Sequence, residues 1–177
     1  MSKAVLISIN PTWCEKIVSG EKTIEVRKTR PKMNPPFKCY IYRSVQGGVI
    51  GEFVCDHIFE RIVRVGASCE APKYCICDWN MDCTPLDTLL ADACLTKDEL
   101  EKYLDGGVGY GWHISNLKIY DTPKELIEFH TWKKCKSCNK SGYESTACIY
   151  DENCIIPAAI TKAPQSWCYV EEEIWND

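Results

Sequence analysis

The chain has 177 residues, of which 45% are hydrophobic, and a formal net charge of −4. This length suits one domain spanning 1–177, and the apolar content excludes a chain that is disordered throughout. No apolar run approaches the roughly 18 residues that a membrane-spanning helix needs. The N-terminal stretch is too short and too polar for a secretion signal, so we expect a cytoplasmic protein without a membrane partner.

The charge is spread unevenly. Residues 1–43 hold nine Lys and Arg but only three Glu, a net charge of +6, so the rest of the chain carries −10. Such asymmetry favours a basic face that meets phosphate. A solvated surface of mixed charge is the alternative.

A short β-strand and a short α-helix are predicted first. Residues 4–10 are apolar and β-branched, which is typical of a buried strand. Asn10 followed by Pro11 is a helix N-cap with proline at the first helical position. Trp13 and Ile17 recur at helical spacing, and Gly20 can end the helix.

The next strand, within 20–28, carries the densest charge. Alternation along a strand places Thr23, Glu25 and Arg27 on one face and the two apolar residues, Ile24 and Val26, on the other. Lys22 precedes the strand and can point to the polar face. The pattern predicts a polar site on a rigid element, or else a structural Glu25–Arg27 ion pair.

Further strands and two helices follow. We expect a strand at 37–43, a turn at Gly47–Gly48, and a strand-rich stretch at 49–65 with Gly51 as a β-bulge. The segment 66–84 is cysteine-rich and irregular. Helices are expected at 85–94 and 96–104, and Thr96 with Glu99 forms a capping box for the second.

The last third begins with a glycine-rich bend at 106–111 and continues with a strand at 112–120 and a short helix at 123–129. Residues 130–163 form a cysteine-bearing polar insert within the domain, and a strand at 164–170 follows. Many strands with few short helices indicate an α+β fold around a small β-barrel that carries the Cys-rich insert.

Thirteen cysteines without a secretion signal argue against a disulfide scaffold. In the insert, the spacing of Cys135, Cys138, Cys148 and Cys154 predicts a structural zinc site, because a CxxC turn supplies two thiolates to one tetrahedral ion. Inert thiols in a loop are the alternative. A second group, formed by Cys69, Cys75, Cys77 and Cys83, has less typical spacing. The remaining five, Cys14, Cys39, Cys55, Cys94 and Cys168, are expected to be buried apolar residues.

Several segments together resemble the ASCH domain, a branch of the PUA-like superfamily. They are Ser8-Ile-Asn-Pro-Thr-Trp13, Gly20-Glu-Lys-Thr-Ile-Glu-Val-Arg27, Gly48-Val-Ile-Gly-Glu-Phe53, the stretch from Trp112 to Pro123, and Pro164-Gln-Ser-Trp-Cys-Tyr-Val170. The resemblance spans about 4–129 and 164–172. It implies a PUA-like small β-barrel of five to six mostly antiparallel strands with flanking short helices, and a cleft beside the first helix that is lined by the 22–27 strand. It also links the chain to recognition of RNA or modified bases.

The residues expected at that cleft suit a nucleic-acid or nucleotide ligand, with RNA the expected class. Glu25 can accept a hydrogen bond from a base, and cations can meet phosphate, while Trp13 or Trp112 can stack on a base. Both tryptophans are equally explained as core residues. The expected binding set is Ser8, Asn10, Trp13, Lys22, Thr23, Glu25, Arg27 and Trp112.

Other functions stay open. The resemblance also implies amidohydrolases acting on N4-acetylcytidine, in which a Lys is followed three residues later by a Thr. Lys22 matches the Lys, but Glu25 stands at the Thr position, so hydrolysis of an N4-acylated cytidine would need Glu25 as a base with Lys22 as its electrostatic partner. A nuclease is disfavoured, since His57 and His113 lack an obvious catalytic set. A protein-interaction adaptor built on the insert is the third class. No organic cofactor is expected, and the sequence does not give the oligomeric state.

Overall fold

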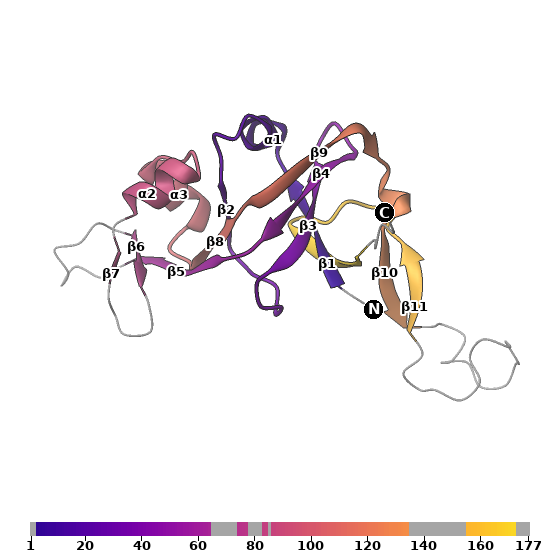
Figure 1. Ribbon diagram of the computed structural model, residues 1–177. Coiled ribbons are helices and arrows are strands. Elements are labelled where there is room, and N and C mark those ends of the chain that lie inside the picture. Colours follow the sequence, from indigo (N-terminus) through magenta and orange to yellow (C-terminus); the bar gives the residue numbers. More distant parts are fainter. Residues whose placement is uncertain (1–2, 65–73, 78–82, 85, 135–154, 173–177) are drawn as a thin grey trace, which may run out of the picture.

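The computed structural model describes residues 3–64, 74–77, 83–84, 86–134 and 155–172. In these ranges the chain forms two five-stranded sheets and a separate two-stranded ribbon. Figure 1 shows helices α2 and α3 over one end of the molecule, and the ribbon projecting from the other end. The mixed α+β class with few short helices is confirmed.

The first sheet has the strand order β12-β1-β3-β4-β9. Its strands are β1 (Lys3–Ile9), β3 (Phe37–Arg43), β4 (Val49–Cys55), β9 (Ser115–Lys124) and β12 (Trp167–Glu171). β1 pairs in parallel with β3, and every other pair is antiparallel. The parallel pair is joined by α1 (Pro11–Val18) and β2 (Ile24–Arg27), so these two elements lie outside the first sheet.

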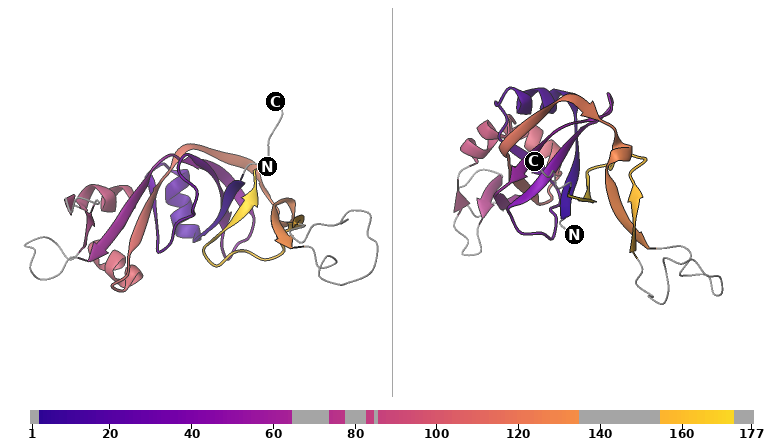
Figure 2. Two further views of the ribbon diagram at one scale, coloured as in Figure 1. Left: turned by 90° about the horizontal axis from the view of Figure 1, so that it is seen from below. Right: turned by 45° about the vertical axis from the view of Figure 1, so that its right-hand side comes forward.

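The second sheet has the order β2-β8-β5-β6-β7 and is antiparallel throughout. Its other strands are β5 (Ile58–Arg64), β6 (Tyr74–Cys77), β7 (Cys83–Thr84) and β8 (Gly109–His113). Two residues separate β4 from β5, and only Ile114 separates β8 from β9. At these two short links the chain passes directly from one sheet to the other, and the two links lie side by side (Figures 1 and 2).

The predicted closed barrel is wrong. β1 is paired on both sides within the first sheet, whereas β2 is an edge of the second, so the described strands form two open sheets. The β1–β2 seam is bridged by a side chain instead of a backbone ladder: Arg27 Nη2 donates to the Ser8 carbonyl oxygen at 2.5 Å. A charged side chain that is buried needs such a partner.

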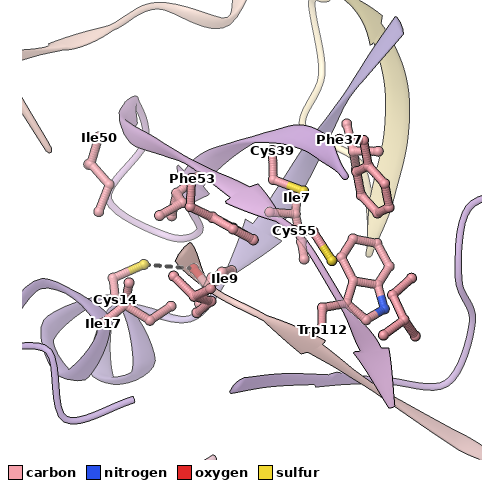
Figure 3. Close-up of a cluster of buried hydrophobic side chains, with 14 residues drawn as sticks. Ile7, Ile9, Cys14, Ile17, Phe37, Cys39, Ile50, Phe53, Cys55 and Trp112 are labelled. Carbon is pink, nitrogen blue, oxygen red and sulfur yellow. Dashed lines mark hydrogen bonds between the residues drawn. The ribbon is translucent and has the colours of Figure 1, made fainter. Parts of the chain in front are cut away.

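Three apolar clusters hold the elements together. The largest fills the space between α1 and the two sheets, and Figure 3 shows Cys14 and Ile17 of α1 facing Ile9, Phe53 and their neighbours. The second joins Ile24 and Val26 of β2 to helices α2 (Asp87–Asp92) and α3 (Lys97–Leu104). β2 therefore packs against an apolar core through Ile24 and Val26, while Glu25 and Arg27 form an ion pair on its other face.

The glycine-rich segment 106–111 bends as expected only in its first part, where Gly106 has a φ of +77°, whereas Gly109 and Gly111 lie within β8. A Cβ built on Gly111 would lie 3.1 Å from Ile24 Cγ2 and 3.3 Å from Leu89 Cδ1. Glycine is thus required there by close packing rather than by a turn. The expected helix at 123–129 is only a 3-10 turn, η1 (Leu126–Glu128), because β9 continues to Lys124.

The irregularity expected at Gly51 is present. The registers of β4 with β3 and with β9 both shift beside this residue. A Cβ at Gly51 would collide with the backbone carbonyl oxygen of Lys118, so only glycine lets β9 approach. The final strand, β12, begins at Trp167 rather than at 164.

The two-stranded ribbon consists of β10 (His130–Lys134) and β11 (Ile155–Ala159), which pair antiparallel from His130–Ala159 to Lys134–Ile155. Phe129 and Ile160, at its base, pack with Ala4, Leu6 and Val170. The predicted insert at 130–163 thus begins on a paired strand, and its second paired strand ends at Ala159, before the predicted end of the insert. Its four candidate zinc ligands, Cys135, Cys138, Cys148 and Cys154, lie outside the described residues.

Candidate functional site

The site starts at the first helix. The Asn10 side chain accepts from the Thr12 backbone N–H at 3.1 Å, and Pro11 opens α1, as the sequence predicts. Cys14 and Ile17 are buried in the largest core. Trp13, one residue before Cys14, packs only partly against that core and lines a pocket between α1, β2 and α3.

β2 supplies the polar wall. Ile24 and Val26 belong to the core under α2 and α3, and Glu25 and Arg27 line the pocket, as the alternation predicts. Val26 also lines the pocket, which the alternation does not predict. Lys22 joins them, although it precedes the strand. The Thr23 N–H donates to the Asp92 carbonyl oxygen, and the Ile114 N–H donates to the Thr23 carbonyl oxygen, which fixes the start of the strand.

Three charged side chains form a buried array, which we call the Lys22–Glu25–Arg27 array. Lys22 Nζ lies 3.4 Å from Glu25 Oε2, and Arg27 Nη2 lies 3.0 Å from Glu25 Oε1, so the carboxylate stands between two cations. Their side chains are only 2%, 8% and 10% exposed, in sequence order. Water hardly screens these charges, unlike those of a surface ion pair.

Backbone groups hold the two cations in place. Lys22 Nζ donates to the Ala93 carbonyl oxygen at 2.7 Å, beyond the end of α2, and lies 5.0 Å from the centre of the Trp13 ring. Arg27 Nη1 lies 3.5 Å from the Ser166 hydroxyl oxygen. Arg27 Nε is buried and has no hydrogen-bond partner among the described residues. An unpaired buried donor is costly, and Arg43 Nε and Trp112 Nε1 share this state among the described residues.

Burial changes the proton affinities here. It lowers the pKa of Lys22 below its usual value, and the Glu25 carboxylate opposes that shift. Burial raises the pKa of Cys14 to about 12, and the charge of Glu25 adds to the rise. Cys14 is therefore a protonated packing residue that donates to the Ile9 carbonyl oxygen (Figure 3), and it is no nucleophile.

The opposite wall comes from Leu95 and from α3, which provides Glu99 and Tyr103. Both bonds of the predicted capping box at Thr96 and Glu99 are present, and hydrogen bonds from Thr96 lower the pKa of Glu99. Sequence reasoning placed the helix but missed these three residues as pocket residues. No local signal reveals them, because they meet β2 only through tertiary packing.

The pocket has a volume of about 290 Å³ and brings together six of the eight expected binding residues: Ser8, Asn10, Trp13, Lys22, Glu25 and Arg27. Thr23 lies beside it without lining it. Trp112 is fully buried in the core, where its ring packs edge-on against Phe37 (Figure 3). Trp112 therefore does not stack on a ligand in this pocket, contrary to expectation. It lies opposite Glu25 in the sheet, but on β8, which is the strand next to the edge strand β2.

Other candidate chemistry is dispersed. Cys14, Cys39 and Cys55 are buried as expected, whereas Cys94 and Cys168 are only partly buried. His113 Nδ1 pairs with Asp56 Oδ1 at 2.6 Å on the surface, and neither residue lines the pocket. Within the described ranges, no group of three or more His, Cys, Asp or Glu is placed to hold a metal ion. None of the helices seen there has the length and apolar character that crossing a membrane requires.

Comparison with known proteins identifies the fold. No protein-family model matches the sequence, and no curated protein matches it significantly. The structure is similar to that of ASCH from Zymomonas mobilis, with 17% identity over 96% of this chain and 88% of that chain and a TM-score of 0.56. A variant of that protein with one Tyr replaced by Phe gives 16% identity, 96% and 91% coverage, and the same TM-score.

These likenesses confirm at the level of the fold what the sequence segments suggested: the chain has the fold of an ASCH domain. At this identity the comparison does not transfer an activity. Function has to be argued from the pocket itself.

Proposed function

We propose that the pocket binds the base of a nucleotide, either within single-stranded RNA or as a modified nucleotide. The observation that carries this proposal is the buried Lys22–Glu25–Arg27 array, which faces a pocket of about 290 Å³ beside the ring of Trp13. A flat heterocycle needs hydrogen-bond partners at its edge and an apolar platform at its face. The pocket offers both, on a strand and a helix.

Trp13 is the platform. Its ring is partly exposed, and stacking of one base on an aromatic side chain is worth about 1–3 kcal/mol. Lys16 Nζ also lies 5.8 Å from the centre of this ring. On the other wall, Lys28 Nζ lies 5.3 Å from the ring centre of Tyr103.

Lys16 and Lys28, which lie beside the Trp13 and Tyr103 rings and which we call the rim cations, suit the phosphate of a nucleotide. Lys28 is exposed and Lys16 partly so, whereas the array cations are buried, so the rim is where a phosphate would stay in water. Binding that uses these cations should weaken as salt rises, because phosphate contacts release counterions. Links between the ASCH domain and RNA support the same class of ligand.

The test is equilibrium binding of short RNA and DNA oligomers, measured by fluorescence anisotropy at several salt concentrations. We expect RNA to bind, Trp13→Leu to weaken binding at every salt, and Lys28→Gln to reduce the salt dependence. The matched control is Lys102→Gln, which removes an exposed cation from α3 outside the pocket lining. Equal binding by the wild type and Trp13→Leu would overturn the proposal.

A second candidate is hydrolysis of an N4-acylated cytidine, favoured by one observation: Lys22 has a lowered pKa and touches a carboxylate. Glu25 would act as the base on a water molecule. Its two cationic partners make it a poor base, so we rank this function second. Release of acetate from N4-acetylcytidine that Glu25→Gln abolishes would support it, and no release at high protein concentration would refute it.

The third function, an adaptor that holds a partner through the cysteine insert, stays a proposal. Binding of a protein partner that survives Trp13→Leu but not deletion of 135–154 would support it.

A further inference from the structure

The order of hydrogen-bonding groups along the pocket wall carries more information than the presence of charge. Lys and Arg side chains only donate hydrogen bonds, and an ionised Glu only accepts them. With Glu25 between Lys22 and Arg27, the array reads donor–acceptor–donor. A ligand edge that pairs with all three must read acceptor–donor–acceptor.

Each member keeps capacity for a ligand. Lys22 Nζ has three N–H donors, of which the Ala93 carbonyl oxygen and Glu25 accept two, and the ammonium also lies 5.0 Å from the centre of the Trp13 ring. Each Glu25 oxygen faces one cation and has a second lone pair. Arg27 Nε–H is buried without a partner among the described residues, and Arg27 is 8% exposed and lines the pocket. The array is therefore held in place but not saturated.

We propose that the pocket reads the imide edge of a uracil-type base, that is, a carbonyl, a ring N–H and a second carbonyl in a row. This inference rests on the proposed function of the pocket. The imide N–H donates to Glu25, while the two flanking carbonyl oxygens accept from Lys22 and Arg27. The base face lies against Trp13, and all of these residues line the same pocket.

Other bases pair less completely. Cytosine directs the lone pair of its ring nitrogen at the carboxylate and its amino group at a cation, so it fits only in a shifted register with two contacts. Adenine has no ring N–H, so in the same register its N1 lone pair faces the carboxylate; contacts through its amino group, N1 and N7 would span two edges of the base. Guanine can donate twice to Glu25 and accept once, but its exocyclic amino group then competes with the second cation. Misaligned or unpaired buried groups are costly, and this cost is the source of discrimination.

The test is calorimetric titration of the wild-type full chain with uridine, cytidine, adenosine and guanosine 5′-monophosphates. Two uridylate analogues separate the contribution of the imide N–H from that of stacking on Trp13. The 3-methyl analogue replaces the imide N–H by a methyl group, and the 5,6-dihydro analogue keeps the imide but loses the flat aromatic ring. We expect uridylate to bind tightest and N-methylation to weaken binding about tenfold or more. The dihydro analogue should lose affinity but keep the imide preference.

Because these arms use the wild type, they do not depend on a variant that folds. Glu25→Gln, which adds an amide donor beside the acceptor, should reduce the preference for uridylate over cytidylate. Glu15→Gln, an exposed change on α1, is the matched control and should keep it.

Binding of cytidylate or guanylate as tight as that of uridylate, or no effect of N-methylation, would overturn the imide reading while leaving a nucleotide pocket. Binding of no nucleotide would overturn the proposed function and the imide reading together.

Discussion

Replacing Glu25 by Gln tests whether the array is a buried charge network. The variant keeps the shape of the side chain but leaves Lys22 and Arg27 without an anion, and the three side chains are at most 10% exposed. Removing one partner of a buried ion pair costs about 3–5 kcal/mol. Gln retains one acceptor, so we expect a loss of about 3 kcal/mol in the free energy of unfolding.

For a chain of this size, 1 kcal/mol shifts the melting temperature by about 2–4 °C, so the expected fall is about 6–12 °C. Urea denaturation and thermal melting followed by circular dichroism measure both values. Adding Lys22→Met to Glu25→Gln removes one of the two buried charges that have lost their anion. In a double-mutant cycle, this second substitution should therefore recover part of the lost stability. A loss below about 1 kcal/mol, the value of an exposed pair, would refute the reasoning.

The loss of stability in the Glu25→Gln variant should also depend on pH. Burial lowers the pKa of Lys22, so between that lowered pKa and the usual 10.5 the folded state binds fewer protons than the unfolded state. Stability therefore rises with pH across this window, and below it the full cost of burying the charge is present. Without Glu25 the pKa of Lys22 in the folded state falls further, so the pH range in which stability rises with pH extends to lower pH. The deficit of Glu25→Gln should accordingly be larger at pH 7 than at pH 10, and a deficit independent of pH would contradict this.

Three further predictions concern the tryptophans, the bulge and the insert. Trp13→Leu should cost about 1–3 kcal/mol of nucleotide binding with little loss of stability, whereas Trp112→Leu should cost about 3 kcal/mol of stability; equal behaviour of the two variants in paired binding and urea assays would contradict the assignment. Gly51→Ala should destabilise by about 1–3 kcal/mol, since its Cβ meets the Lys118 carbonyl oxygen, and an unchanged urea midpoint would contradict that packing. If the insert cysteines bind zinc, metal analysis should find about one zinc ion per chain, which chelation removes with a fall in melting temperature; a metal-free protein with unchanged melting would refute it.

Local patterns in the sequence predict the polar strand well. Alternation alone places Ile24 and Val26 in the core, although Val26 also lines the pocket, and the cap residues locate α1 and α3. These features depend on neighbours within a few residues, so a linear pattern contains them.

Tertiary packing decides the rest. Whether Trp112 lines a pocket or fills the core depends on its depth in the sheet, which alternation does not encode, and it lies one strand inside the edge. Glu99 and Tyr103 join the site only because α3 packs beside β2, more than seventy positions away in the chain. The open seam follows from placing β1 and β2 in different sheets, which depends on long-range pairing.

The most direct test of the nucleotide pocket is an NMR titration of the 15N-labelled protein with uridine 5′-monophosphate, with the Trp13 indole signal assigned through Trp13→Phe. The account predicts saturable shifts of the Trp13 indole and of the backbone amides at 22–27 and 95–103, with the amides of β10 and β11 unchanged. Shifts confined to other surfaces, or none at saturating nucleotide, would contradict it.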